Sequence, residues 1–132
     1  MSDYIVPHLS EEKPDIVIIH CGGNDLPTPS KRPVMLTTIA NEIIDTGLLC
    51  RKAKVKNIAI AGVTIRETPF LKKRCEELND LLRSMCKLNN FMFIDNSEIT
   101  EEHLFDGIHL NQDGSKILAE NYLSALWKMH NS

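Results

Sequence analysis

The sequence lacks the features expected of a membrane protein, a disulfide-bonded protein or a nucleic-acid-binding protein. No stretch approaches the roughly 20 consecutive apolar residues of a membrane-spanning helix, and no signal peptide opens the chain. The cysteines show neither a CxxC pair nor the spacing of zinc ligands. The formal net charge is -3, and basic residues are interspersed with acidic ones. We therefore expect a cytoplasmic protein with reduced thiols that binds neither a membrane nor a nucleic acid.

The size and composition indicate a single globular domain. The chain has 132 residues, of which 42% are hydrophobic and 25% charged, so it can bury a modest core while remaining soluble. No internal repeat, low-complexity segment or interdomain linker divides it. We therefore expect residues 1–132 to form one domain.

Short runs rich in isoleucine and valine predict buried strands at Asp15–Cys21, Asn57–Val63 and Phe91–Asp95. Each run is mostly apolar on both faces, whereas a strand with one solvated face would alternate between apolar and polar residues. This pattern is typical of a parallel sheet that helices cover on both sides.

Helical periodicity predicts helices between these strands, at Val34–Arg51 and Pro69–Leu88, and after the last strand, at Gln112–Met129. Thr68 is a predicted N-cap with Pro69 in the first turn, and Asn111 is the predicted cap of the last helix. The first dozen residues resemble the end of one further helix. In the first predicted helix the apolar face comprises Leu36, Ile39, Ala40, Ile43, Ile44 and Leu48. In the last it comprises Leu118, Tyr122, Ala125 and Met129.

The alternation of helices and strands predicts an α/β fold, a three-layer α/β/α sandwich around a parallel sheet. Ligands of such sheets bind beyond the carboxyl ends of the strands. The sequence "GGND", residues 22–25, follows the first strand directly, and "DGIH", residues 106–109, precedes the last helix. In the second sequence a carboxylate beside an imidazole could fix the ring tautomer and leave Nε2 as a general base. Taken alone, an Asp-x-x-His is a weak signal, because a turn with a solvated histidine has the same sequence.

Together, the two sequences and their surroundings, "KPDIVIIHCGGNDL" and "DGIHLNQDGSKILAE", resemble the SGNH (GDSL-type) hydrolase family over the whole chain. The resemblance implies the flavodoxin-like SGNH fold and hydrolysis of acyl esters by a serine, with no metal or cofactor and a small-molecule ester as substrate. It also implies that His109 is the general base and Asp106 its orienting partner. Asn24 would donate its side-chain amide to the oxyanion, while Gly22 and Gly23 would let the backbone turn and the substrate approach.

One part of the family pattern is missing from the sequence. In the family, the nucleophilic serine lies in a Gly-Asp-Ser block after an earlier strand, and no serine of this chain follows a Gly-Asp pair. We therefore expect an N-terminally truncated domain that is inactive alone. Cys21, Ser30 and Ser97 are weighed as substitutes. A packed core position explains Cys21 better, a solvated loop explains Ser30, and a capping or loop role explains Ser97.

Two further expectations follow from the missing block. In the family the nucleophile strand adjoins the strand seen here at Asp15–Cys21, so this strand would be an unprotected edge that favours a homodimer. The alternative function is a non-catalytic binding or protein-association module on the same fold. A flavodoxin-like nucleotide-binding or response-regulator domain is disfavoured, because no phosphate-binding glycine loop and no acidic pocket is evident.

Overall fold

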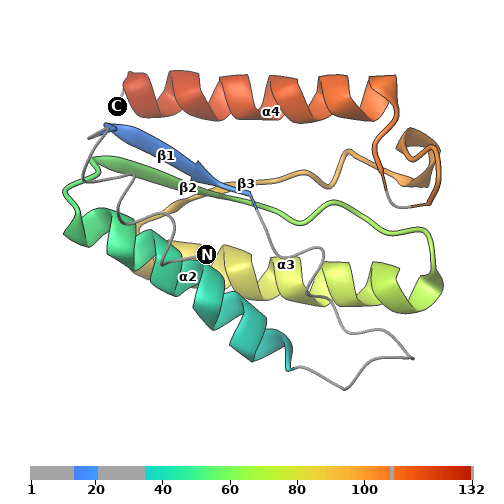
Figure 1. The fold of residues 1–132 in the computed structure, drawn as a ribbon, viewed down its shortest axis with the longest axis horizontal. Coiled ribbons are helices and arrows are strands. Elements are labelled where there is room, and N and C mark those ends of the chain that lie inside the picture. The colour runs from blue at the N-terminus through green and yellow to red at the C-terminus, as the bar shows by residue number, and fades with distance from the viewer. Residues whose placement is uncertain (1–13, 21–34, 108, 132) are drawn as a thin grey trace.

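The computed structural model describes residues 14–20, 35–107 and 109–131 (Figure 1). Its elements are β1 (Ile16–Ile19), α2 (Leu36–Lys52), β2 (Asn57–Ala61), α3 (Pro69–Asn89), β3 (Met92–Ile94), the short 3₁₀ helix η2 (Glu101–His103) and α4 (Gln112–His130). The predicted strand and helix bounds agree with these to within two residues. The helix predicted for the first dozen residues lies outside the described residues. Among the described helices, none is both long enough and apolar enough to cross a membrane.

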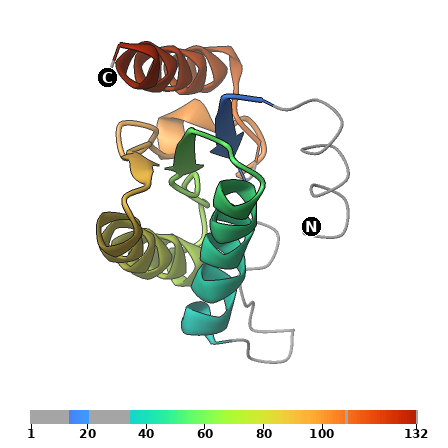
Figure 2. The same ribbon diagram turned by 90° about the vertical axis from the view of Figure 1, so that its left-hand side faces the viewer.

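The described strands form one parallel sheet in the order β1-β2-β3. Ile18 pairs with Ala59 between β1 and β2, and Ala59 pairs with Met92 between β2 and β3. Helices α2 and α3 cover one face of the sheet and α4 covers the other, as the two ribbon views show (Figures 1 and 2). The predicted three-layer α/β/α sandwich is therefore confirmed.

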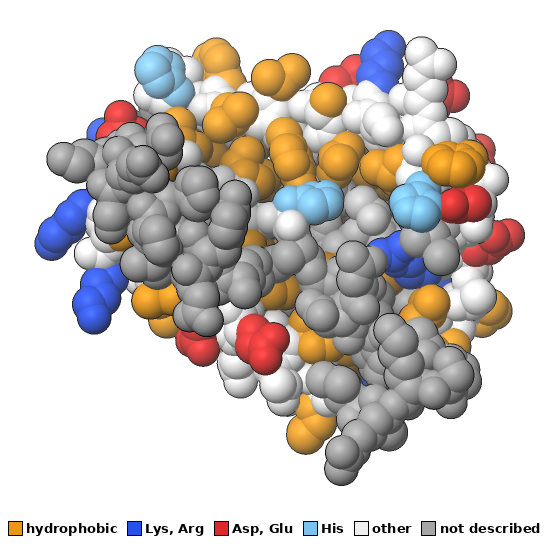
Figure 3. Space-filling model, viewed as in Figure 1, with side chains coloured by type: hydrophobic (Ala, Val, Ile, Leu, Met, Phe, Trp, Pro, Cys, Tyr) orange, Lys and Arg blue, Asp and Glu red, His pale blue; other side chains and the backbone are white. Residues whose placement is uncertain are grey.

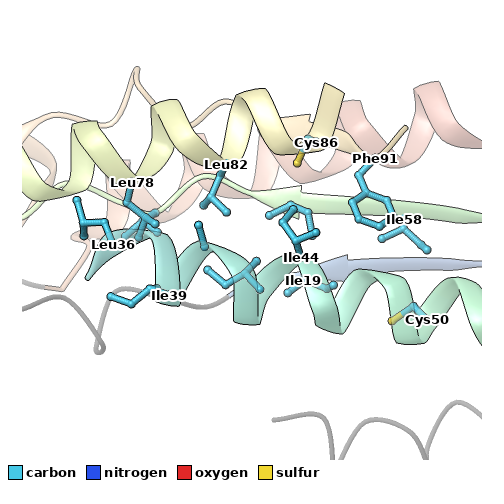
Figure 4. Packing of buried hydrophobic residues seen from close by; sticks show 14 of the residues in the cluster. Ile19, Leu36, Ile39, Ile44, Cys50, Ile58, Leu78, Leu82, Cys86 and Phe91 are labelled. Atoms are coloured by element: carbon cyan, nitrogen blue, oxygen red, sulfur yellow. The ribbon is translucent and has the colours of Figure 1, made fainter. Parts of the chain in front are cut away.

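The strands divide their side chains between two apolar clusters. Ile58 and Ile60 of β2 point toward α2 and α3, where most of the core lies (Figure 4). The alternate residues Ala59 and Ala61 point toward α4 and pack near Met129. Because side chains alternate between the faces of a strand, the small alanines leave room for a single helix to lie close on that face.

The buried face of α2 differs from the predicted one at its C-terminal end. Leu48, which was predicted to lie on the apolar face, is 40% exposed. Gly47 is buried instead, and it lies against the ring of Phe91, the residue before β3. A β-carbon on Gly47 would lie 2.8 Å from Phe91 Cε2, so the helix and the ring meet closely because this residue has no side chain.

Strand β1 lies at the edge of the sheet formed by the described residues. The Asp15 carbonyl accepts a hydrogen bond from the Asn57 N–H at 2.9 Å. Along a strand, the N–H and C=O groups of successive residues point alternately toward and away from the neighbouring strand. The N–H and C=O groups of Ile16 and Ile18 therefore point away from β2. Figure 3 shows hydrophobic side chains gathered along α4 on the face seen there. Pairing of this edge with a second copy of the chain stays a prediction, which sedimentation of the purified protein would test.

Asparagine side chains extend the hydrogen bonding of the sheet beyond the end of β2. Asn79 of α3 accepts from the Val63 N–H at 2.7 Å and donates to the Val63 carbonyl at 2.9 Å. Asn96 is buried; its amide donates to the Gly62 carbonyl at 2.8 Å, and Asn121 donates to its side-chain oxygen at 3.1 Å. These contacts fix the backbone at the carboxyl edge of the sheet, where ligands of this architecture bind.

Replacing Asn79 with leucine should lower the free energy of unfolding, because the buried backbone groups of Val63 lose their partners. Each unpaired group costs about 1–3 kcal/mol. The measurement is the midpoint of urea unfolding followed by circular dichroism. Asn89→Leu is the matched control, since Asn89 lies on the same helix and its side chain donates to the Met85 carbonyl of that helix. Equal midpoints for the two variants would show that the Asn79 contacts do not hold this edge.

Candidate active site

The segment between β3 and α4 carries the predicted base and its partner. Leu104 and Leu110 form an antiparallel bridge, and the Phe105 N–H donates to the His109 carbonyl at 3.0 Å. Phe105 and His109 thus lie opposite each other at the base of a loop that these two contacts close. A loop closed by backbone hydrogen bonds can hold two side chains in a fixed relation to each other.

Within this loop Asp106 and His109 contact each other twice. One carboxylate oxygen of Asp106 accepts the His109 backbone N–H at 2.6 Å, and the other lies 2.5 Å from His109 Nδ1. An ionised carboxylate is only an acceptor, so Nδ1 of the neutral ring carries the proton and Nε2 presents its lone pair. No hydrogen-bond partner of Nε2 is found among the described residues, and the His109 side chain is 68% exposed. The two contacts orient the ring as a general base would require, and the role of His109 as a base stays a prediction.

Gly107 gives the loop the backbone shape that the pair requires. Its φ is +81°, a conformation that L side chains rarely adopt. Its carbonyl accepts the Glu67 N–H at 3.0 Å, which ties the loop after β2 to the loop before α4. A β-carbon on Gly107 would also meet the Glu67 side chain. The sequence between Asp106 and His109 therefore sets both the turn and its contact with the neighbouring loop.

The C-terminal side of the loop is fixed by the start of α4. Asn111 caps the helix, as predicted, by accepting the Gly114 N–H at 2.9 Å, and its amide donates to the Glu102 carbonyl at 2.9 Å. His103 accepts the Thr100 N–H on Nδ1 at 2.9 Å, which closes η2. Gly114 lies so close to His103 that a β-carbon there would be 2.8 Å from the His103 carbonyl oxygen. Helix α4, η2 and the loop that carries His109 therefore pack against one another.

The predicted oxyanion residues Gly22, Gly23 and Asn24 lie outside the described residues, so their distance from His109 stays a prediction. The strand that leads to them is described as far as His20. The His20 ring contacts the Tyr122 hydroxyl of α4 through Nδ1, edge to face. The end of β1 is therefore held against the same helix that anchors the His109 loop.

The described cysteines, and Ser97 among the substitute nucleophiles weighed above, lack an activated environment. Cys50, Cys75 and Cys86 are free and buried, and burial raises the pKa of the Cys86 thiol to about 11. A thiol with so high a pKa is protonated at neutral pH and is a poor nucleophile. The Ser97 N–H donates to Asp95 at 2.8 Å, in agreement with the loop role expected for this residue. Cys21 and Ser30 lie outside the described residues.

Two hollows among the described residues lie away from the His109 loop. One, with a volume of about 700 Å³, lies between the start of α2 and α3 and is lined by Met35, Leu36, Thr37, Arg74, Glu77, Asp80, Leu81 and Ser84. Another, of about 540 Å³, borders η2 and is lined in part by Lys72, Thr100 and Glu101. Neither of these two hollows is lined by Asp106 or His109.

A parallel α/β/α sandwich with an Asp-x-x-His pair after its last strand is the arrangement expected of an SGNH-type hydrolase domain. The sequence matches the model of the GDSL-like lipase/acylhydrolase family over residues 3–117. The chain therefore belongs to this family, and the predicted resemblance is confirmed. No curated protein matches the sequence significantly.

Several solved structures share the fold. A GDSL-like lipase from Bacteroides thetaiotaomicron is 18% identical with a TM-score of 0.74, and the match covers 97% of this chain and 71% of the lipase. A carbohydrate acetylesterase from Sinorhizobium meliloti is 20% identical with a TM-score of 0.74, covering 96% and 67%. A catalytic mutant of an acetylxylan esterase from Geobacillus stearothermophilus is 20% identical with a TM-score of 0.71, covering 91% and 66%. At these identities the likeness shows the fold alone.

Two neighbours of the Asp-His pair were not predicted from the sequence. Phe105 stacks on the His109 ring, and the Glu67 backbone binds Gly107. The turn at Gly107 itself could have been predicted, because a glycine after an aspartate favours a turn with positive φ. The role of Glu67 depends on a contact between loops 40 residues apart in the sequence, which no local pattern reveals.

Proposed function

We propose that this domain carries the general-base and oxyanion half of a serine-type acyl-ester hydrolase site, and that it does not hydrolyse esters alone. The observation that supports the proposal is the double contact of Asp106 with His109, at 2.6 and 2.5 Å. The ring of an ordinary solvated loop histidine is free to rotate, whereas here one carboxylate binds both the backbone N–H and the ring of His109. The family of the chain makes acyl-ester chemistry the natural use of such a pair.

In this proposal each group has one task. His109 Nε2 accepts the proton of an attacking hydroxyl and later returns it to the leaving alcohol, while Asp106 stabilises the imidazolium formed between these steps. Asn24 donates to the oxyanion of the tetrahedral intermediate, and Gly22 and Gly23 let the ester carbonyl approach. No metal or cofactor takes part.

The missing component is the nucleophile. The sequence contains no Gly-Asp-Ser, and a base without a hydroxyl to activate supplies only a small part of a hydrolase's rate. A second candidate function rests on the same observation: the domain binds acyl or carbohydrate groups, or a protein partner, without catalysis. Turnover of a simple ester separates this second function from the parent activity.

The proposal is tested by incubating the folded protein with a fluorophosphonate probe, which reacts covalently with activated serines. Intact mass and ester turnover are then recorded for the natural chain and for His109→Ala. We expect no adduct, and turnover no faster for the natural chain than for the variant. The chain must first give a cooperative unfolding transition, so that a negative result reports on the folded site.

A stoichiometric adduct that is lost in His109→Ala would overturn the proposed inactivity. Peptide mapping of that adduct would identify the serine that acts as nucleophile. An adduct that persists in His109→Ala would show that His109 is not the base, and the assignment of the site would then be wrong.

A further inference from the structure

The His109 imidazole has a second neighbour besides Asp106. The ring of Phe105 stacks on it, with ring centroids 5.8 Å apart and planes inclined by 23°. Aromatic rings interact favourably in offset stacks over centroid separations of about 4.5–7 Å. Asp106 therefore holds the Nδ1 edge of the imidazole, and Phe105 covers one of its faces.

The position of Phe105 is not explained by the core. Its side chain is 69% exposed, although phenylalanine is among the residues most often buried. The backbone places it beside His109, because the Phe105 N–H donates to the His109 carbonyl at 3.0 Å next to the Leu104–Leu110 bridge. Residues that face each other across an antiparallel pair bring their side chains into contact. The loop therefore presents an apolar ring to solvent and to His109 at once.

Asp106 alone would hold the imidazole weakly. The side chains of His109 and Asp106 are 68% and 38% exposed, and ion pairs or hydrogen bonds in contact with water compete with solvent. Rotation of an exposed ring about its side-chain bonds would move Nδ1 away from the carboxylate. A ring packed flat against one face of the imidazole opposes that rotation.

We infer that Phe105 is a positioning residue that keeps the His109 imidazole against Asp106, so that Nε2 faces the reacting groups. This inference rests on the proposed function of His109 as a base, but the contact itself is measurable without any turnover. Phe105 is not expected to touch the transferred acyl group. Its effect passes through the orientation of His109.

The experiment follows His109 by NMR spectroscopy of isotopically labelled protein. In the natural chain the carbon-bound ring protons of His109 should be shifted by the ring current of Phe105. In Phe105→Ala this shift should disappear, and the Nδ1 proton should exchange with water about two- to tenfold faster, the factor that corresponds to one aromatic pair. Phe105→Tyr keeps the aromatic face and should restore both properties.

Trp127→Ala is the matched control, because Trp127 is an aromatic side chain of α4 with 68% exposure. It should leave both properties of His109 unchanged. Unaltered His109 signals in Phe105→Ala, or equal changes in Trp127→Ala, would overturn the inference. Should Phe105→Ala fail to fold, Phe105→Leu keeps the apolar volume without the aromatic face and gives the same comparison. An adduct in the fluorophosphonate test would contradict the proposed inactivity while leaving this result intact.

Discussion

Gly47→Ala should destabilise the protein, although alanine is the better helix former. Within α2 the substitution would normally gain about 1 kcal/mol from helix propensity. Here the new β-carbon would lie 2.8 Å from Phe91 Cε2 and 2.9 Å from Phe91 Cζ, far closer than carbon atoms approach. Overpacking of a filled core typically costs about 1–3 kcal/mol. The measurement is the midpoint of guanidinium unfolding.

The Phe91 ring has little room to move away from the new methyl group. It is buried, and the Arg51 guanidinium lies over it at 4.4 Å from the ring centroid while donating to the Asn89 carbonyl at 2.6 Å. Phe91→Leu should therefore relieve the clash, so that Gly47→Ala costs less in that background than in the natural chain. Leu48→Ala, at the adjacent exposed position, controls for helix effects. A midpoint that rises in Gly47→Ala would contradict the contact.

The contact of Gly47 could not be predicted from the sequence, whereas the strands and helices could. The strands and helices repeat apolar residues at the periods of their own geometry, so their bounds were predictable to within two residues. The Asp106–His109 pair was predictable because both residues lie in one short loop. The contacts of Gly47 with Phe91 and of Asn79 with Val63 join segments distant in the sequence, and no local pattern specifies them.

The same reasoning separates the two halves of the candidate site. Asp106 and His109 belong to one closed loop, so their contact needs only the local turn at Gly107. The distance between Asn24 and His109 depends on how the end of β1 packs against α4. His20 and Tyr122 make one such contact immediately before the Asn24 segment. Asn24 itself lies outside the described residues, and its place in the site stays a prediction.

Asp106→Asn should sharply lower the reactivity of His109 toward diethyl pyrocarbonate, a reagent that acylates unprotonated imidazole nitrogens. In the natural chain Nδ1 donates to Asp106, and Nε2 presents its lone pair to solvent. In the variant the Asn oxygen can still accept the His109 backbone N–H, which places the amide N–H₂ at Nδ1. Nδ1 must then accept, so the proton moves to Nε2 and neither nitrogen is available. We expect a loss of about tenfold, the tautomer bias that corresponds to one hydrogen bond.

Asp106→Ala distinguishes this tautomer effect from a general disturbance of the loop. It removes the carboxylate without supplying a donor, so His109 should react at least as fast as in the natural chain. Modification is read by peptide mapping at one fixed, slightly alkaline pH, and His130 serves as an internal reference in every sample. Equal rates in the natural chain and in Asp106→Asn would mean that Asp106 does not set the tautomer of His109. The pair would then be a structural contact of the loop, and the general-base role proposed for His109 would lose its physical support.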